Sequence, residues 1–187
     1  LIMSLTKTPI CDFGNKAQSF SLRSTSRKLL NLEDVKGDNG TLIMFICNHC
    51  PYVKAIISDI VNDCKKLKVL GISSVAICSN DADNYPEDSF ENMINFGKQN
   101  DFSFPYVHDE TQEIAKKYGA VCTPDFFGYN KNLELQYRGR IRELKDLKPV
   151  RNGDSELFID MKNISETGVG PKNQIPSMGC NICLLYT

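Results

Sequence analysis

The sequence predicts a single α/β domain in which helices cover a mixed β-sheet on both faces. Three observations predict this fold class. Strand-like and helix-like segments alternate along the chain, which is typical of a sheet with parallel strands and covering helices. The apolar run 41–46 is unbroken and bounded by turns, as in a strand that is buried on both faces, and 72–78 is predicted to be the next buried strand. The segment 125–137 contains a closing hairpin, which adds antiparallel strands.

The N-terminal part of the chain contains a hairpin and the first buried strand. Residues 20–22 and 28–30 are short strand-like runs around a turn-rich segment, and they predict an N-terminal β-hairpin extension. Asp38-Asn39-Gly40 is a turn signal directly before the apolar run 41–46. The first strand of the core is therefore expected over 41–46.

Residues 51–67 predict an amphipathic helix after this strand. Its apolar residues fall at spacings of three and four and so form one stripe: Val53, Ile56, Ile57, Ile60, Val61 and Cys64. The next buried strand, 72–78, is followed by a polar loop over 80–88 and a helix over 89–99. The residues of that helix that are expected to face the core are Phe90, Met93, Ile94 and Phe96.

The C-terminal half is predicted to close the sheet. In order, it contains a short strand over 104–107, a helix over 111–118, a hairpin of 125–129 and 133–137, and a helix over 155–165. Thr111 or Asp109 is a candidate cap for the first of these helices, and Asp154 or Ser155 for the second. We expect one domain over 1–187, with a core of about 15–166 and an irregular C-terminal tail over 167–187.

Composition and charge exclude several classes of protein. The 187 residues are 41% hydrophobic, which is enough for a core, and the net charge of −1 indicates neither a nucleic-acid partner nor an anionic membrane surface. No run approaches the roughly 18 apolar residues of a membrane-spanning helix. The first ten residues are too short and too polar for a secretory signal, so a cytoplasmic location is the default expectation, although a removed signal peptide would leave the same sequence.

Eight cysteines are the most distinctive feature of the composition: Cys11, Cys47, Cys50, Cys64, Cys78, Cys122, Cys180 and Cys183. The chain is too long and too rich in core residues to need a disulfide framework. A reducing compartment fits better, with a few cysteines performing chemistry and the others packed as small apolar residues. Cys64 and Cys78 fall on apolar faces, so we expect them in the core.

Cys47-Asn48-His49-Cys50-Pro51 stands where a buried strand ends and an amphipathic helix begins. Pro51 is tolerated only near the first turn, so it fixes the start of the helix close to the cysteines. The unpaired amides at a helix N-terminus stabilise a thiolate and lower its pKa into the range of roughly 3.5–7.5. We expect Cys47 to be the exposed nucleophile and Cys50 the buried resolving thiol. His49 would stabilise the reduced thiolate and make the disulfide more oxidising.

The Cys47/Cys50 pair, followed far downstream by Thr123-Pro124 before a strand, resembles the thioredoxin superfamily. More narrowly, residues 45–54 resemble the peroxiredoxin-like (AhpC/TSA-type) proteins of bacteria that carry a thioredoxin-style dithiol, and 118–127, 137–140 and 176–180 are similar to later blocks of that group. The resemblance implies a thioredoxin-like three-layer sandwich and thiol–disulfide oxidoreductase chemistry. It also implies a cis peptide at Thr123-Pro124 that faces the dithiol and offers the backbone of Thr123 to a substrate strand.

The sequence departs from these relatives at three places. Thr41 stands about where thioredoxins have a buried aspartate, so proton removal from Cys50 must use water or another group. Ile46 replaces the usual tryptophan before the first cysteine. When Cys50 is aligned with a peroxidatic cysteine, Ile43 and Cys47 replace the proline and the threonine or serine expected ahead of it, which argues against peroxidase activity.

The favoured prediction is an enzyme that exchanges dithiol and disulfide with protein or small-molecule thiols, without a cofactor or metal. Cys47 would attack, Cys50 resolve, His49 tune the potential, and Thr123 and Pro124 align the substrate. One alternative is a thiol peroxidase that reduces hydroperoxides. The other is a module that binds zinc or cuprous ion through Cys47 and Cys50 with a histidine or the tail pair Cys180/Cys183, because paired thiolates suit both ions.

Two further cysteines are candidate auxiliary thiols. Cys122 is adjacent to Thr123-Pro124, although a packed cysteine at a strand end is an equally simple interpretation. Cys180 would reach the site if the tail folded back, and it would then act as an auxiliary or resolving thiol near Cys122. The cluster Arg138, Arg140, Arg142 and Arg151 is better explained as a solvated face than as an anion site.

Overall fold

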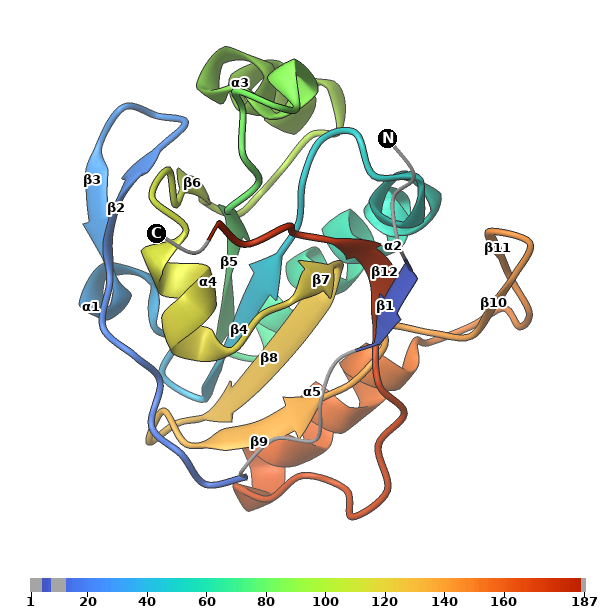
Figure 1. Cartoon of the computed structure of the whole chain (residues 1–187). Coiled ribbons are helices and arrows are strands. Elements are labelled where there is room, and N and C mark those ends of the chain that lie inside the picture. Colours follow the sequence, from blue (N-terminus) through green and yellow to red (C-terminus); the bar gives the residue numbers. More distant parts are fainter. Residues whose placement is uncertain (1–4, 8–12, 186–187) are drawn as a thin grey trace.

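The structure is a computed structural model that describes residues 5–7 and 13–185; Cys11 lies outside them. A seven-stranded mixed sheet in the order β3-β2-β6-β5-β4-β8-β9 forms the middle layer (Figure 1). Its strands are β2 (Ser21–Ser24), β3 (Leu29–Asn31), β4 (Gly40–Phe45), β5 (Ile72–Cys78), β6 (Tyr106–His108), β8 (Asp125–Asn130) and β9 (Leu135–Arg138). The helices are α1 (Leu32–Val35), α2 (Pro51–Val69), α3 (Phe90–Gln99), α4 (Glu113–Tyr118) and α5 (Glu156–Thr167), with a 3₁₀ turn, η1, at Pro86–Asp88.

Strand directions confirm the mixed sheet. β4 and β5 pair in parallel, as do β5 and β6, because helical connections join them. β8 pairs antiparallel with both β4 and β9 and closes the sheet as a hairpin. The predicted N-terminal hairpin is formed by β2 and β3, and β2 joins it to the main sheet by pairing with β6.

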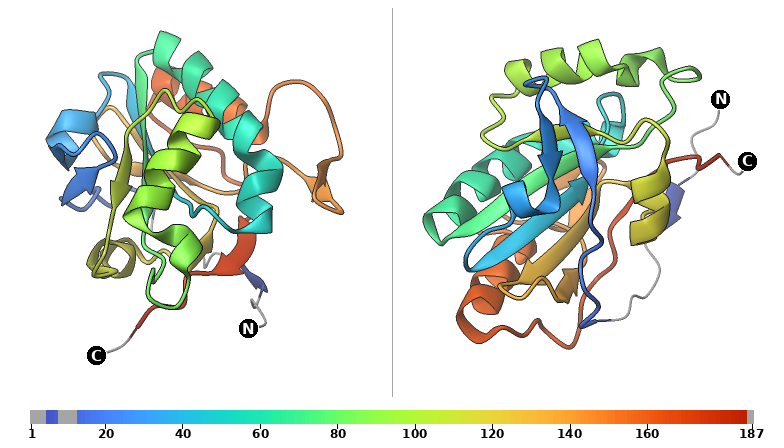
Figure 2. Two further views of the ribbon diagram at one scale, coloured as in Figure 1. Left: turned by 90° about the horizontal axis from the view of Figure 1, so that it is seen from above. Right: turned by 90° about the vertical axis from the view of Figure 1, so that its left-hand side faces the viewer.

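Helices cover both faces of the sheet, so the three predicted layers are present (Figure 2). The side chains of β4 alternate between the two faces, as they must in a strand. Leu42 and Met44 pack in the core beneath α2 and α5, whereas Ile43 and Phe45 pack in the second core with residues of α1 and α4. The unbroken apolar run thus reflects a strand with no solvent-facing side. None of the described helices combines the length and apolar character that spanning a membrane requires.

The helix starts follow local capping rules. Pro51 is the first residue of α2, and Cys50 is its N-cap in an extended conformation. The Ser155 hydroxyl accepts a hydrogen bond from the Phe158 amide and caps α5 as predicted. Asp109 reaches forward to α4, where its carboxylate accepts hydrogen bonds from the Ile114 and Ala115 amides.

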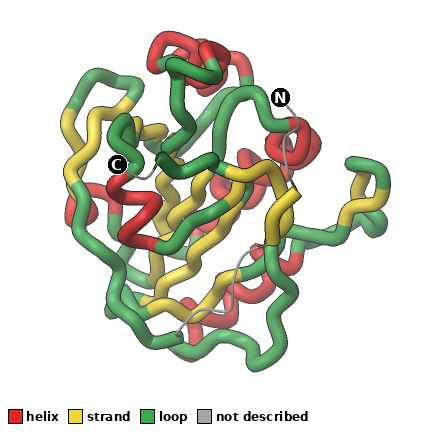
Figure 3. The backbone as a smooth tube through the Cα atoms, in the orientation of Figure 1, coloured by secondary structure: helices red, strands yellow, loops and turns green. Residues whose placement is uncertain are grey.

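The prediction of an irregular tail over 167–187 is wrong in one segment. Residues Met178–Asn181 form the strand β12, which lies between β1 (Leu5–Lys7) and β7 (Cys122–Thr123) in a separate three-stranded sheet. Figure 3 shows the loop that carries the chain from α5 to this strand. A four-residue strand is too short to show a period, and both of its partners are remote in sequence. Only the folded chain brings the three segments together.

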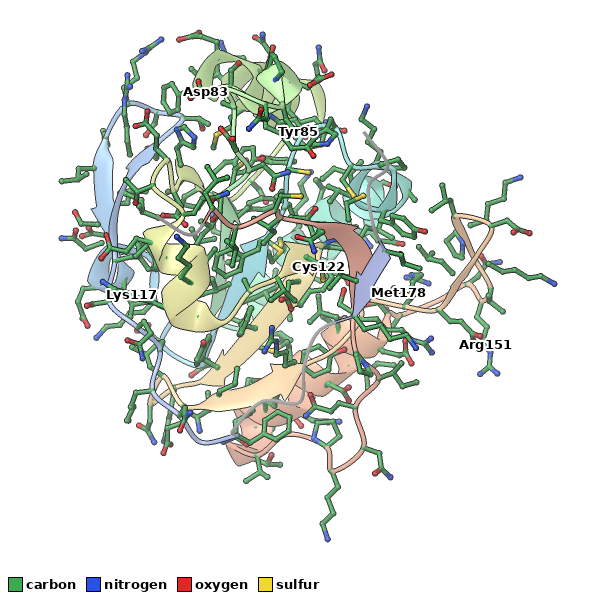
Figure 4. All side chains as sticks on the ribbon, viewed as in Figure 1. Asp83, Tyr85, Lys117, Cys122, Arg151 and Met178 are labelled. Carbon is green, nitrogen blue, oxygen red and sulfur yellow. The ribbon has the colours of Figure 1, made fainter. Side chains whose placement is uncertain are left out.

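The arginine cluster does not form one solvated face. Arg138 is buried and donates to the Asp125 carboxylate at 2.9 Å, and Arg140 pairs with Glu156 at 2.8 Å. Arg142 lies 3.0 Å from an Asp59 carboxylate oxygen. Arg151 follows the projecting segment that contains β10 (Leu144–Lys145) and β11 (Lys148–Pro149) (Figure 4), and its backbone carbonyl accepts a hydrogen bond from the Arg142 guanidinium at 3.0 Å. Acidic side chains from other elements therefore pair with three of the four arginines.

Candidate active site

The Cys-x-x-Cys loop joins the end of β4 to the start of α2 and is held in place by its second residue. The Asn48 amide donates to Asp88 Oδ1 at 2.8 Å. The Asn48 side chain donates to the Glu87 carbonyl at 3.0 Å and accepts from the Tyr106 hydroxyl at 2.8 Å. These bonds connect the loop to β6 and to the segment before α3, so two elements outside the loop hold it between the two thiols.

Three cysteines meet at this loop, and all are buried. Cys47 and Cys50 are both 0% exposed, and Cys180 is 3% exposed. The Cys180 sulfur lies 2.7 Å from the Cys50 sulfur, within hydrogen-bond distance, although 130 residues separate the two in sequence. Strand β12 brings it there by pairing Cys180 with Thr123 in β7 (Figure 1).

Cys50 is the acidic thiol of this group. Its pKa falls to about 5, chiefly because the Cys47 thiol donates a hydrogen bond to its sulfur. Burial opposes the ionisation, while the Cys180 thiol and the Val53 amide in the first turn of α2 favour it. The helix N-terminus thus does stabilise a thiolate, and the N-cap position of Cys50 explains which one.

The expectation that Cys47 is exposed and acidic is wrong. Burial raises the pKa of Cys47 well above its ordinary value, and the neighbouring Cys50 and Asp88 raise it further. Cys47 precedes the N-cap by three residues, and its sulfur lies 3.4 Å from the Thr123 hydroxyl. Cys47 is therefore placed to donate a hydrogen bond to the thiolate of Cys50 rather than to carry the charge itself.

His49 is coupled to a buried acid that the sequence did not reveal. Its Nδ1 lies 2.5 Å from Asp88 Oδ2, and the Asp88 carboxylate is 0% exposed. This contact raises the pKa of His49 above its ordinary value, although burial works against it. The imidazole also stacks on Tyr85 with ring centroids 5.1 Å apart.

Asp88 supplies the buried acid that the first core strand lacks. Thr41 occupies the position where a buried acid was expected, and its hydroxyl instead accepts a hydrogen bond from the Gly37 amide. Asp88 lies in the polar loop before α3, where no local pattern distinguishes it from Asp81 or Asp83. The one local signal is its place directly before Ser89, the N-cap of α3.

Thr123-Pro124 is a cis peptide, as expected, and it adjoins the thiols. The Cys50 sulfur lies 3.5 Å from the Thr123 carbonyl oxygen. The edge of Thr123 is not free for a substrate, however, because β12 already pairs with it. β12 occupies the edge where a substrate strand was expected. It is part of the same chain, and its other edge pairs with β1.

The remaining described cysteines differ from one another in their surroundings. Cys122 is buried in β7 with its sulfur 3.8 Å from the Pro124 carbonyl, and burial raises its pKa (Figure 4). Its cross-strand partner is Asn181, so Cys180 meets Cys50 and not Cys122. Burial raises the pKa of both Cys64 and Cys78 to about 12, as expected of core thiols. Cys183 is exposed.

A groove of about 490 Å³ opens beside Pro124. Its apolar wall includes Tyr52, Ile56, Phe126 and Met178, and Lys7, Arg140 and Arg142 add positive charge. None of the described cysteines lines this groove. The groove therefore reaches the cis-proline segment while β12 separates it from the sulfurs.

One set of side chains in the site has the composition of a metal centre. The donor atoms of Cys47, His49 and Asp88 lie within 4.8 Å of one another. A thiolate, an imidazole and a carboxylate together suit zinc. The second ring nitrogen of His49, Nε2, is buried and makes no hydrogen bond within the described protein.

Fold and site together define the class of this protein. This is a thioredoxin-like protein, because it has a mixed sheet between two helical layers, a Cys-x-x-Cys pair at the start of α2 and a cis-proline beside that pair. Within that class, the chain belongs to the AhpC/TSA family, whose model matches residues 13–144.

Individual relatives agree with this family. The crystal structure of an uncharacterized conserved protein from Geobacillus kaustophilus is 40% identical, covers 97% of each chain and aligns with a TM-score of 0.85. The thioredoxin domain of thiol-disulfide oxidoreductase BVU-2223 from Bacteroides vulgatus shares the fold, with a TM-score of 0.61 at 14% identity over 86% of this chain and 100% of that one. Thiol-disulfide oxidoreductase ResA of Bacillus thuringiensis subsp. konkukian (strain 97-27) is 28% identical over 134 residues, 68% of this chain and 69% of that protein.

Proposed function

We propose that this protein is a thiol–disulfide oxidoreductase in which Cys50 attacks and Cys47 resolves. The observation that carries the proposal is the lowered pKa of Cys50, which keeps its sulfur ionised at neutral pH. A thiolate is the nucleophile in thiol–disulfide exchange. The ResA relative is named for this activity, and it supports the same chemistry here.

The reaction has two exchange steps. The Cys50 thiolate attacks one sulfur of an external disulfide, forms a mixed disulfide and releases the other half as a thiolate. Cys47 then loses its proton and attacks the Cys50 sulfur, which releases the second half and forms the Cys47–Cys50 disulfide. Since the negative charge on Cys50 is gone at that stage, one cause of the raised Cys47 pKa is gone as well.

The His49–Asp88 pair is expected to tune the dithiol from beside Cys47. It is the titratable pair whose donor atoms lie within 4.8 Å of the Cys47 sulfur. The Asp88 charge keeps the imidazole protonated to higher pH than usual. In this proposal, His49 and Asp88 are positioning residues that set the potential of the dithiol, because a stabilised reduced form makes the disulfide more oxidising.

The test compares turnover on a protein disulfide with turnover on hydrogen peroxide. We expect Cys50→Ser to reduce disulfide turnover below about 1% of wild type, because the nucleophile is lost. Cys47→Ser should still react with the substrate at Cys50 but should form no Cys47–Cys50 disulfide. Cys64→Ser, which changes a core thiol, serves as the control with near wild-type turnover.

Two results would contradict the assignment of roles. One is a mixed disulfide that accumulates on Cys47 in the Cys50→Ser variant. The other is peroxide consumption that depends on Cys50 and outpaces disulfide turnover, which would favour the peroxidase alternative.

A metal-binding module is the second candidate, favoured by the proximity of Cys47, His49 and Asp88. On this alternative, protein purified from zinc-containing medium carries bound zinc, and both Cys47→Ser and His49→Gln lose it. Elemental analysis of the reduced protein measures this directly. Zinc-free protein with full disulfide turnover rejects the alternative.

A further inference from the structure

Strand β12 fills the edge of Thr123, the place where a substrate strand was expected. Cys180 pairs with Thr123 and Asn181 with Cys122, in antiparallel register. The pairing is extended on both sides, since the Ile182 amide donates to the Val121 carbonyl and the Ser177 hydroxyl donates to the Pro124 carbonyl at 2.6 Å. The C-terminal segment is thus bonded along the whole cis-proline segment.

Gly179 shows how closely this strand approaches. A Cβ atom at this position would lie 1.9 Å from the Thr123 carbonyl oxygen and 3.0 Å from Pro124 Cδ. Both of these atoms belong to the cis-proline segment, so a side chain there could not be accommodated by rotation of a flexible neighbour. Glycine is what allows β12 to lie flat against Thr123 and to point Cys180 at the dithiol.

We propose that Cys180 is a third redox thiol that exchanges with Cys50, carried on a strand that mimics a bound substrate. The proposal rests on the proposed thiol–disulfide exchange and adds a residue to it. Its basis is the 2.7 Å separation of the two sulfurs and the pairing of Cys180 with Thr123. In a substrate strand bound at this edge, the reacting cysteine would occupy the place that Cys180 holds.

The exchange is balanced with an external disulfide as the oxidant. Cys50 attacks that disulfide and forms a mixed disulfide, and one half of the reagent leaves as a thiolate. Cys180 then loses its proton to solvent and attacks the Cys50 sulfur, so that the second half leaves and the Cys50–Cys180 bond forms. In total, two cysteine thiols are oxidised and one external disulfide is reduced to two thiols.

Cys47 and Cys180 compete for the same sulfur. Attack by Cys47 on Cys50 of the Cys50–Cys180 disulfide forms the Cys47–Cys50 bond and frees Cys180, with no net change in oxidation state. The Cys50–Cys180 bond ties β12 to the site, and its cleavage leaves β12 held only by backbone pairing and packing. Because the Cys50 sulfur is fully buried and Cys180 of β12 lies against it, we expect an external disulfide to reach Cys50 when β12 moves aside.

The decisive experiment removes Cys47 and asks whether Cys180 takes over as the resolving thiol. Reduced Cys47→Ser protein is treated with hydroxyethyl disulfide, free thiols are alkylated, and disulfide-linked peptides are mapped by mass spectrometry. We expect both halves of the reagent to leave and a Cys50–Cys180 bond to form. Cys47→Ser/Cys180→Ser should instead retain one half of the reagent on Cys50, and the matched control Cys47→Ser/Cys183→Ser should behave like Cys47→Ser.

A second measurement tests the strand without changing a cysteine. Gly179→Ala should push β12 away from Thr123 and speed alkylation of Cys50 by a bulky maleimide at least about tenfold, since the open state becomes more populated. Gly97→Ala is the matched control, because a Cβ there meets only an ordinary contact at 3.4 Å from Phe102. Its alkylation rate should equal that of wild type.

The results separate this inference from the proposed function. If Cys47→Ser keeps the reagent on Cys50 while Cys180 remains free to alkylate, the third-thiol proposal is overturned and the Cys47/Cys50 mechanism stands. An unchanged alkylation rate in Gly179→Ala overturns the role of β12 as a cover. If wild-type protein forms no disulfide at Cys50 at all, both proposals fail together.

Discussion

At the residue scale, one negative charge is shared unequally among three neighbouring sulfurs. Cys50 carries it because Cys47 and Cys180 donate to it and because it is the N-cap of α2. The pKa of each neighbour is raised, by burial first and by the hydrogen bond to Cys50 next. Without β12, Cys47 and Cys50 would hold the charge differently, since the Cys180 donor and the burial that this strand contributes would be absent.

The ionisation of Cys50 is measurable without any reagent. We expect the ultraviolet absorbance of the thiolate to titrate with a midpoint near pH 5 in reduced wild-type protein and to be absent from Cys50→Ser. The folded-state pKa is lowered, so the thiolate stabilises the native state at high pH. This stabilisation should decline as the pH falls from about 9, the ordinary thiol value, towards 5. A midpoint near the ordinary thiol value would show that the donors to Cys50 are ineffective.

Asp88→Asn should lower the pKa of His49 towards its ordinary value, because the hydrogen bond that the imidazole donates to the Asp88 carboxylate is the main cause of the shift. The loss of charge-assisted bonds should also cost about 1–3 kcal/mol of unfolding free energy. Because the pKa of His49 is raised in the folded state, its interaction with Asp88 stabilises the folded protein most at pH values below the unfolded-state pKa. The loss of unfolding free energy in Asp88→Asn should therefore be larger at about pH 6 than at about pH 9. NMR titration of the imidazole and denaturation at both pH values measure these effects.

Asp109→Asn is the control for this prediction. Asp109 is likewise a buried carboxylate, and it accepts hydrogen bonds from two amides and from Ser79. Its replacement should destabilise the protein by a similar amount and leave the His49 titration unchanged. An equal shift of the His49 pKa in both variants would mean that the effect is not specific to Asp88.

At the scale of elements, the ends of helices and strands place the chemistry. α2 begins at Pro51, so its N-terminus faces Cys50; α3 begins after Ser89, which leaves Asp88 directed towards the dithiol loop. α5 is fastened to α2, because the Ser155 hydroxyl caps α5 and also donates to the Asp63 carboxylate at 2.5 Å. A single side chain therefore joins two helices on the face that carries the dithiol.

Ser155→Ala should cost more stability than the loss of a cap alone. Removing the cap costs about 0.5–2 kcal/mol, and the Asp63 carboxylate would in addition lose a buried partner. Ser89→Ala is the matched control, since Ser89 caps α3 through one amide and makes no second side-chain bond of this kind within the described part of the chain. Urea denaturation of both variants gives the comparison. Equal losses would show that the bond to Asp63 contributes nothing.

At the scale of the whole molecule, long-range contacts hold the layers in register. Arg138 in β9 pairs with Asp125 in β8 and also donates to the Gly119 carbonyl at the end of α4. Both partners of the ion pair are buried, and burial raises the pKa of Asp125 to about 6 despite the arginine. The pair joins the closing hairpin to α4, and its acidic member, Asp125, directly follows Pro124.

Arg138→Met should destabilise the protein by about 3–5 kcal/mol, because it leaves the buried Asp125 without its partner. Arg140→Met breaks a partly exposed pair with Glu156 and should cost less than about 1 kcal/mol. Combining Arg138→Met with Asp125→Leu should recover part of the loss. Thermal and denaturant unfolding of the set tests this, and similar costs for the two arginines would contradict it.

Much of the architecture was predictable because its signals are local. The apolar runs of β4 and β5, Pro51 at the start of α2 and Ser155 before α5 each express a preference of neighbouring residues. The Cys47/Cys50 pair was found from a short motif, and the cis peptide at Thr123-Pro124 was implied by the resemblance to the thioredoxin superfamily. Pro51 predicted a helix start close to the cysteines, whereas the structure shows that Cys50, and not Cys47, is the N-cap.

The sequence by itself determined the mixed α/β class, the order of the elements and the presence of a dithiol at a helix start. Only the tertiary structure decided which sulfur is ionised, which acid serves His49 and which strand covers Thr123. These properties depend on Asp88, Cys180 and β12, each of which reaches the site from a distant part of the chain. The pKa of a buried group depends on every charge and donor around it, and that surrounding is assembled only when remote segments pack together.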